Sequence, residues 1–140
     1  MYPDSFKSEP SKKTPWVIME PGRIFIMGRS ISENPGEFYR PVLDWISKYT
    51  HNYTGKTRIE FGFEYVNTSS TKWIYMLLKE LSEIKGISMN AMFTWYFEQG
   101  DEDMDELGYI LRSLIDCPFT SVEVTSMNGD RYEKIFSDKK

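Results

Sequence analysis

Cysteine, histidine and long apolar runs are all scarce in this sequence of 140 residues. Its single cysteine, Cys117, cannot form an intramolecular disulfide, so nothing in the composition requires an oxidising compartment. No stretch approaches the roughly 20 apolar residues of a membrane-spanning helix. Residues 1–13 are polar and lack the apolar segment of a secretion signal. We therefore expect a cytoplasmic protein without a membrane-inserted segment.

Basic residues are outnumbered by acidic ones, 17 against 21, and the formal net charge is −4. The basic clusters are Lys12–Lys13 and Lys139–Lys140, and both fall near the ends of the chain. Nucleic-acid binding draws most of its affinity from basic groups that neutralise phosphates. We therefore expect no nucleic-acid partner.

Residues that could carry catalysis or hold a metal are few. His51 lies in a polar connector and has no sequence-readable nucleophile or metal partner. Cys117 precedes a proline at the end of a predicted helix, where a buried structural thiol is favoured over a nucleophile. The acidic run 101–106 could attract a divalent cation. It lacks the spacing of a calcium loop, however, and it precedes a predicted helix, where carboxylates offset the helix dipole. The sequence has no glycine-rich phosphate loop and no zinc-ligand spacing. We predict no enzymatic activity, cofactor or metal.

Hydrophobic periodicity predicts strands alternating with helices in one domain. A hairpin is expected at 16–19 and 23–27, because the intervening residues Glu20–Gly22 favour a turn. Further strands are expected at 59–65, 89–97 and 119–124, where apolar residues alternate or cluster. Helical spacing is found over 38–49, 74–81 and 104–115; Pro35 suits the first turn of the first helix, and Pro41 inside it could cause a kink.

This alternation indicates an α/β fold. The strands at 59–65 and 89–97 have one apolar and one mixed face, so we expect the three helices mainly on one side of the sheet. The other side would then be free to meet water or a partner. We expect a flexible N-terminal arm at 1–14, a domain at 15–126 and a C-terminal tail at 127–140.

The most informative segment is Tyr65–Lys72, where a strand leads into a helix. Four consecutive hydroxyl residues, 68–71, follow Asn67. One hydroxyl is needed as the helix N-cap, which accounts for one or two of the four. Lys72 stands in the first turn, where the helix dipole disfavours a cation unless an anion is also present. A phosphate on Thr68 would lie near free amides and Lys72. These residues raise the hypothesis of a phosphoacceptor beside the purely structural reading, without deciding which hydroxyl would be modified.

At this segment the sequence resembles the SiaC-type family of bacterial regulatory phosphoproteins, which is similar to the SpoIIAA-like (STAS-like) anti-sigma-factor antagonists. The resemblance extends from about Trp16 to Val124. The segments that carry it are 28–34 (GRSISEN), 65–72 (YVNTSSTK), Trp95-Tyr96, 101–104 (DEDM) and Pro118-Phe119.

The resemblance implies a single STAS-like domain with a mixed sheet of about five strands and three helices mainly on one face. It also implies a partner-switching cycle. A GHKL-type protein kinase would phosphorylate Thr68, and a PP2C-type phosphatase would remove the phosphate. The unphosphorylated form would bind an effector such as a diguanylate cyclase, which makes cyclic-di-GMP.

Site residues follow from the same resemblance. Asn67, Ser69, Ser70 and Lys72 would flank the phosphoacceptor. By analogy with the fold, the residues expected on the partner-binding rim are Glu33, Asn34, Trp95, Asp101 and Asp103. Two alternatives remain open: a constitutive adaptor that binds through an exposed sheet face, and a small metal-dependent hydrolase built on the acidic run.

Overall fold

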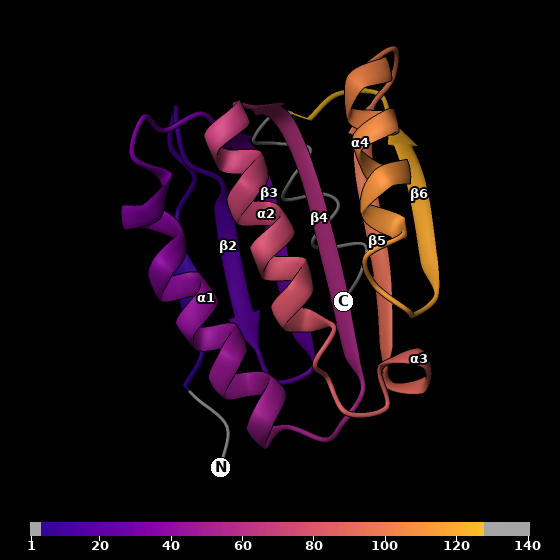
Figure 1. Ribbon diagram of the computed structural model, residues 1–140. Coiled ribbons are helices and arrows are strands. Elements are labelled where there is room, and N and C mark those ends of the chain that lie inside the picture. Colours follow the sequence, from indigo (N-terminus) through magenta and orange to yellow (C-terminus); the bar gives the residue numbers. More distant parts are fainter. Residues whose placement is uncertain (1–3, 128–140) are drawn as a thin grey trace.

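A computed structural model describes residues 4–127, which form a six-stranded mixed sheet with three long helices on one face (Figure 1). In chain order the elements are β1 (Phe6–Ser8), β2 (Trp16–Glu20), β3 (Arg23–Ser30), α1 (Pro35–Asn52), β4 (Thr57–Val66), α2 (Thr68–Leu81), α3 (Ile87–Asn90), β5 (Ala91–Glu98), α4 (Glu102–Arg112) and β6 (Phe119–Val124). The predicted α/β class and the one-sided helix layer are confirmed.

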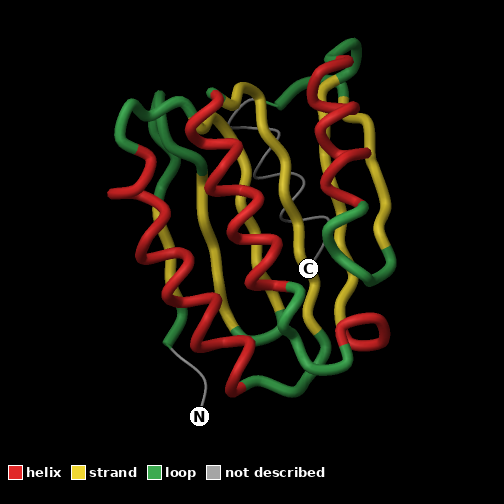
Figure 2. Tube along the Cα trace, viewed as in Figure 1, coloured by secondary structure: helices red, strands yellow, loops and turns green. Residues whose placement is uncertain are grey.

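The strands lie in the sheet in the same order as in the chain. β1, β2 and β3 are antiparallel neighbours, and the β2–β3 turn uses Gly22 at φ 89°. From β3 to β6 all neighbours are parallel, and α1, α2 and α4 belong to the crossovers between them. The loops that follow β3, β4 and β5 therefore lie at one edge of the sheet, where α1, α2 and α4 begin (Figure 2).

The main core lies between the helices and the sheet. On the sheet side it contains Ile24, Ile26, Ile59, Phe61, Phe63, Phe93 and Trp95. On the helix side it contains Val42, Ile46, Ile74, Leu77, Leu78, Leu81 and Leu111. Pro41 does not end α1, because its ring is exposed on the outer side while Val42 and Ile46 hold the helix on the sheet.

The second face of the sheet differs from the expected open surface. A second apolar cluster there includes Phe25, Met27 and Tyr96, all buried, and Met127 packs against it. A side chain at Gly62 would collide with Tyr96 and Met127. The expectation of an open face was wrong for the middle of the sheet, where apolar side chains of β3 and β5 are buried in this cluster, because burial of apolar surface stabilises the fold.

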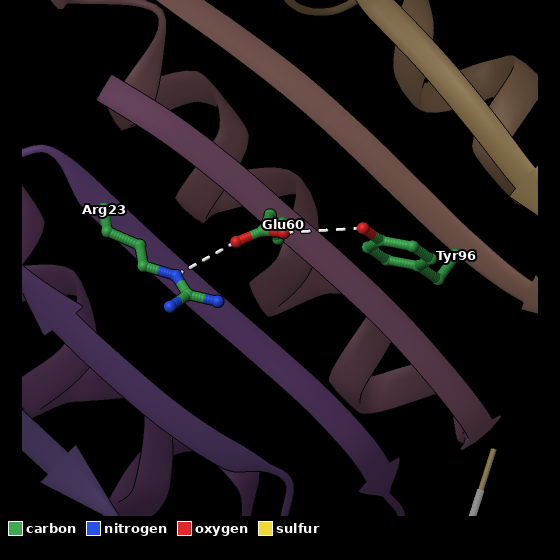
Figure 3. A network of polar contacts seen from close by, with 3 residues as sticks. All are labelled: Arg23, Glu60 and Tyr96. Atoms are coloured by element: carbon green, nitrogen blue, oxygen red, sulfur yellow. Dashed lines mark hydrogen bonds and ion pairs between the residues drawn. The ribbon is translucent and has the colours of Figure 1, made fainter. Parts of the chain in front are cut away.

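Charged groups are also buried on this second face. Arg23 Nε donates a hydrogen bond to Glu60 Oε1 at 3.0 Å, and the Tyr96 hydroxyl donates to Glu60 Oε2 at 3.4 Å (Figure 3). Burial and the neighbouring Glu60 charge raise the pKa of Tyr96 far above its ordinary value. The phenol therefore remains a hydrogen-bond donor to the carboxylate.

The expected N-terminal arm contains a short strand. Residues 6–8 of the expected arm form β1, which pairs with β2, and Trp45 Nε1 donates a hydrogen bond to the Asp4 carbonyl oxygen at 2.5 Å. This short strand explains why the sheet has six strands and not about five. Met127, assigned to the tail, belongs to the second cluster. Residues 128–140 lie outside the described part of the chain.

Three side chains predicted to point inward are exposed: Tyr65, Met89 and Leu114. In β4 a bulge at Glu64 lets Arg29 pair with Tyr65 and turns that ring to the second face. Met89 is 83% exposed because residues 87–90 form the short helix α3 instead of the start of a strand. Leu114 lies past the end of α4, where helical spacing no longer determines direction.

Candidate phosphoacceptor site

Asn67 joins β4 to α2 and fixes the start of that helix. Its side-chain oxygen accepts a hydrogen bond from the Ser70 amide at 2.9 Å, and its side-chain nitrogen donates to the Ser32 carbonyl oxygen at 3.0 Å. The Asn67 amide donates to the Ser30 carbonyl oxygen at 3.0 Å. We had expected one of the four hydroxyls to be the N-cap, but the N-cap is Asn67. An asparagine side-chain carbonyl satisfies the third amide of the helix equally well.

With the cap supplied by Asn67, the hydroxyls differ in accessibility. Thr68 and Ser69 are exposed, and the Ser69 hydroxyl donates to the Asn67 side-chain oxygen at 3.3 Å. Ser70 is 0% exposed, and its hydroxyl has no hydrogen-bond partner within the described residues. Thr71 is partly buried, and its hydroxyl donates to the Asn67 carbonyl oxygen at 3.2 Å. A kinase could therefore reach Thr68 or Ser69 on the folded protein, but not Ser70.

The electrostatics of the first turn favour an anion. Thr68 is the first residue of α2, and the turn contains no acidic side chain. Amide N–H groups at a helix N-terminus carry partial positive charge. Lys72 is exposed and lies four residues after Thr68, which puts the two side chains on the same side of the helix. A phosphate on Thr68 would have both partial and full positive charge beside it.

Four of the five predicted rim residues lie at the edge of the sheet where α2 begins. Glu33 and Asn34 are exposed in the loop after β3, which the Asn67–Ser32 hydrogen bond connects to the start of α2. Asp101 caps α4 by accepting a hydrogen bond from the Met104 amide at 3.1 Å, and Asp103 is exposed in the first turn. Sequence reasoning missed the Ser32 contact because a main-chain acceptor leaves no side-chain signal.

Trp95 is the exception among the predicted partner contacts. Its side chain is 0% exposed, and its indole nitrogen donates to the Met104 carbonyl oxygen at 2.9 Å. Gly108 of α4 packs against the ring so closely that a Cβ there would overlap it. Trp95 therefore cannot touch a partner; it anchors α4 to the sheet.

His51 and Cys117, which were considered as catalytic or metal-binding residues, make contacts within the fold. The His51 ring nitrogen Nδ1 lies 2.7 Å from the Ser47 carbonyl oxygen. Burial, and secondarily the charge of Asp116, raise the pKa of the Cys117 thiol to about 11. Within residues 4–127, no group of three or more histidine, cysteine or acidic side chains could hold a metal ion. No helix in that range is both long and apolar enough to cross a bilayer.

Comparison with known proteins bears on what this edge does. Residues 8–124 match the SiaC family, which is described as a family of regulatory phosphoproteins. The match covers most of the chain. The chain belongs to the SiaC family.

This SiaC family member has a relative by sequence and others by fold. A curated relative from Pseudomonas aeruginosa (strain UCBPP-PA14), described as uncharacterized, is 26% identical over 113 residues, or 81% of this chain and 86% of its own length. SiaC of P. aeruginosa matches with a TM-score of 0.77 at 22% identity, over 86% of this chain and 99% of that one. A crystal structure of the diguanylate cyclase SiaD in complex with its activator SiaC from the same organism also matches, with a TM-score of 0.77 at 23% identity, over 85% of this chain and 99% of that one.

Proposed function

We propose that this SiaC family member is a cytoplasmic partner-switching regulator whose phosphoacceptor is Thr68. A GHKL-type kinase adds the phosphate and a PP2C-type phosphatase removes it. The unphosphorylated form binds and activates a diguanylate cyclase. The observation that carries the proposal is the exposed Thr68 side chain at the first position of α2, beside Lys72 and free of the capping role that Asn67 fills.

The comparisons support two parts of this cycle. The family description names regulatory phosphoproteins. A structural relative is called the activator of a diguanylate cyclase. That this chain also binds a diguanylate cyclase is part of the proposal.

The electrostatics of the site support control of partner binding by phosphorylation. A phosphate adds nearly two negative charges at neutral pH. The amides and Lys72 stabilise that charge on the free protein, so the fold tolerates it. A partner seated over the same edge would have to desolvate the dianion. A loss of about 3 kcal/mol in binding free energy changes affinity more than a hundredfold.

The test is to purify the protein from its native host and map phosphate by mass spectrometry, with and without treatment by a PP2C-type phosphatase. We expect one phosphate, on the tryptic peptide containing Thr68, that the phosphatase removes. Phosphate on Ser69 alone would identify Ser69, and not Thr68, as the phosphoacceptor. Phosphate confined to other parts of the chain would refute the assignment.

The two alternatives from the sequence gain less support. An adaptor that binds through an open sheet face would need an accessible second face, yet Phe25, Met27 and Tyr96 are buried there. A metal-dependent hydrolase would need converging ligands. The acidic run instead starts α4, where Asp101 acts as the N-cap.

A further inference from the structure

The second face of the sheet is buried only in its middle. Phe25 and Met27 of β3 are 0% exposed there, and Tyr96 of β5 is 2% exposed. Towards the ends of the strands the same face is open, because Met92 at the start of β5 is 55% exposed and Tyr65 at the end of β4 is 58% exposed. The side chains of Phe25, Met27 and Tyr96 thus form a limited buried area, the second-face patch.

The patch needs a covering layer that the described helices do not supply. Among the described residues, α1, α2 and α4 all lie on the opposite face (Figure 1). The side chains around the patch are Trp16 of β2 and Val122 and Val124 of β6, which are only partly buried, together with Met127. Neighbours within a sheet flank one another but leave their outer surfaces open to water. Rings buried to this extent therefore require a second layer above them.

An ion pair in the same region supports a cover of limited extent. Arg23 and Glu60 have side chains only 5% and 3% exposed. Arg29 and Glu64, nearer the end of β3, have side chains 41% and 22% exposed. Water is excluded from one pair and reaches the other, although both lie on the second face. A layer over the middle of the sheet that stops short of this end accounts for the difference.

The chain itself leads to the patch. Met127, the last described residue, is 1% exposed and packs where a Cβ at Gly62 would collide with it. Residues 128–140 follow. A helix of that length extends roughly 20 Å, which is enough to cross three or four strands. The N-terminal residues start from the other face, because the Asp4 carbonyl oxygen accepts a hydrogen bond from Trp45 of α1.

The sequence of residues 128–140 suits a cover for an apolar surface. Tyr132, Ile135 and Phe136 have the spacing that places side chains on one side of a helix, whereas a strand would put Ile135 and Phe136 on opposite sides. Apart from Ser137, the other residues from 130 to 140 are charged, which suits the side turned to water. An Asn-Gly pair at 128–129 favours a turn before the helix. The pattern therefore predicts a short amphipathic helix.

We propose that residues 128–140 dock as an amphipathic helix on the second-face patch and complete a second core there. Tyr132, Ile135 and Phe136 contact the patch, and the charged residues face water. The family match ends at residue 124, so this cover lies outside the part of the chain that matches the family. It is independent of the proposed phosphorylation at Thr68. A partner protein can use this face only by displacing the segment.

Methionine oxidation tests the cover in the full-length protein. Hydrogen peroxide converts accessible methionine side chains to the sulfoxide, and peptide mapping by mass spectrometry gives a rate for each residue. Met27 lies under the proposed helix, whereas Met92 on the same face is exposed. We expect Met27 to react at least about tenfold more slowly than Met92. Equal rates for the two residues would overturn the proposal.

A matched pair of variants assigns the protection to residues 128–140. Phe136→Asp should raise the Met27 oxidation rate about tenfold or more, because a charged side chain cannot pack on the patch. Ser137→Asp adds the same charge on the opposite side of the predicted helix and should change that rate less than about twofold. Met19, 0% exposed in the main core, should stay protected in both variants. Equal Met27 rates in the two variants would overturn the proposal.

NMR of the unsubstituted chain keeps the proposal testable if Phe136→Asp unfolds the domain, which fast Met19 oxidation would reveal. In the full-length, isotope-labelled protein we expect nuclear Overhauser contacts from the Ile135 methyl groups to the Met27 methyl group or the Tyr96 ring. The absence of these contacts would overturn the proposal. Contacts found only between labelled and unlabelled chains in a mixed sample would assign the patch to a second copy, and would overturn it too.

Discussion

The side-chain amide of Asn67 donates a hydrogen bond to the main-chain carbonyl oxygen of Ser32 at 3.0 Å. The two residues are 35 positions apart in the chain. This contact ties the loop after β3 to the first turn of α2, while the same side chain caps the helix through the Ser70 amide. One asparagine thus positions Thr68 relative to the loop that holds Glu33 and Asn34.

Replacing Asn67 should therefore destabilise the fold. Asn67→Ala removes both the cap and the loop contact, and we expect a loss of about 1–2 kcal/mol in the free energy of unfolding. Asn67→Asp keeps the capping oxygen but turns a second carboxylate oxygen towards the Ser32 carbonyl oxygen, so its cost measures the loop contact apart from the cap. Urea denaturation followed by circular dichroism measures both. A loss below about 0.3 kcal/mol for Asn67→Ala would contradict the capping role.

Substitutions at Thr68 should change binding without changing folding. Thr68→Ala should leave the unfolding midpoint nearly unaltered and abolish phosphate incorporation by the cognate kinase. Thr68→Asp should weaken effector binding about tenfold, less than phosphothreonine would, because aspartate carries one charge. The control is Ser88→Asp, an equal charge on an exposed residue of α3. Calorimetric titration showing equal affinities for the two aspartate variants would argue against an electrostatic switch at Thr68.

Gly108 should resist substitution although it lies in a helix. Alanine is the better helix former by about 1 kcal/mol, so an exposed position would gain stability. Here the added methyl group would overlap the Trp95 indole ring, and we expect a net loss of about 1–3 kcal/mol. The smaller ring in Trp95→Phe should restore part of that loss in the double variant. Additive costs in a double-mutant cycle would show that the two residues do not constrain each other.

Two ion pairs among the described residues of the sheet should differ in strength. Arg23–Glu60 is 3.0 Å long with side chains 5% and 3% exposed, whereas Arg29–Glu64 is 3.1 Å long with side chains 41% and 22% exposed. Glu60→Gln should cost about 3 kcal/mol or more, because it leaves a buried guanidinium opposite a neutral group. Glu64→Gln should cost less than about 1 kcal/mol. If both variants lost the same free energy of unfolding in denaturant, burial would not determine how much each ion pair contributes to stability.

The Cys117 thiol should react slowly in the folded protein. Its pKa is raised from 9.0 to about 11, and the thiolate is the reactive form. Alkylation by iodoacetamide at pH 8 should therefore be at least about tenfold slower in the folded protein than in urea, and should accelerate as pH approaches 11.

The same shift fixes the sign of a pH effect on stability. Folding favours the protonated thiol, so this contribution is complete below pH 9 and is lost as pH rises from 9 towards 11. Cys117→Ser should remove that part of the alkaline loss. Fast alkylation at pH 8 in the folded state would contradict the raised pKa.

Much of the architecture was predictable because it depends on local pattern. Alternation in β4 and β5 and helical spacing in α1, α2 and α4 gave the α/β class and the one-sided helix layer. Errors arose where distant parts of the chain meet. β1 was read as a flexible arm because three residues are too few for a periodic signal. Tyr65 was assigned to the core because a bulge is a property of two paired strands and not of one.

The candidate site likewise has features that follow from local sequence and features that depend on tertiary packing. The sequence by itself determined that hydroxyl residues and Lys72 would stand at the start of a helix after a strand, because caps and dipoles act over a single turn. Only the tertiary structure decided that Ser70 is buried while Thr68 is exposed, and that Trp95 is buried and holds α4. Burial depends on which elements pack together, and that is fixed by contacts between residues far apart in the chain.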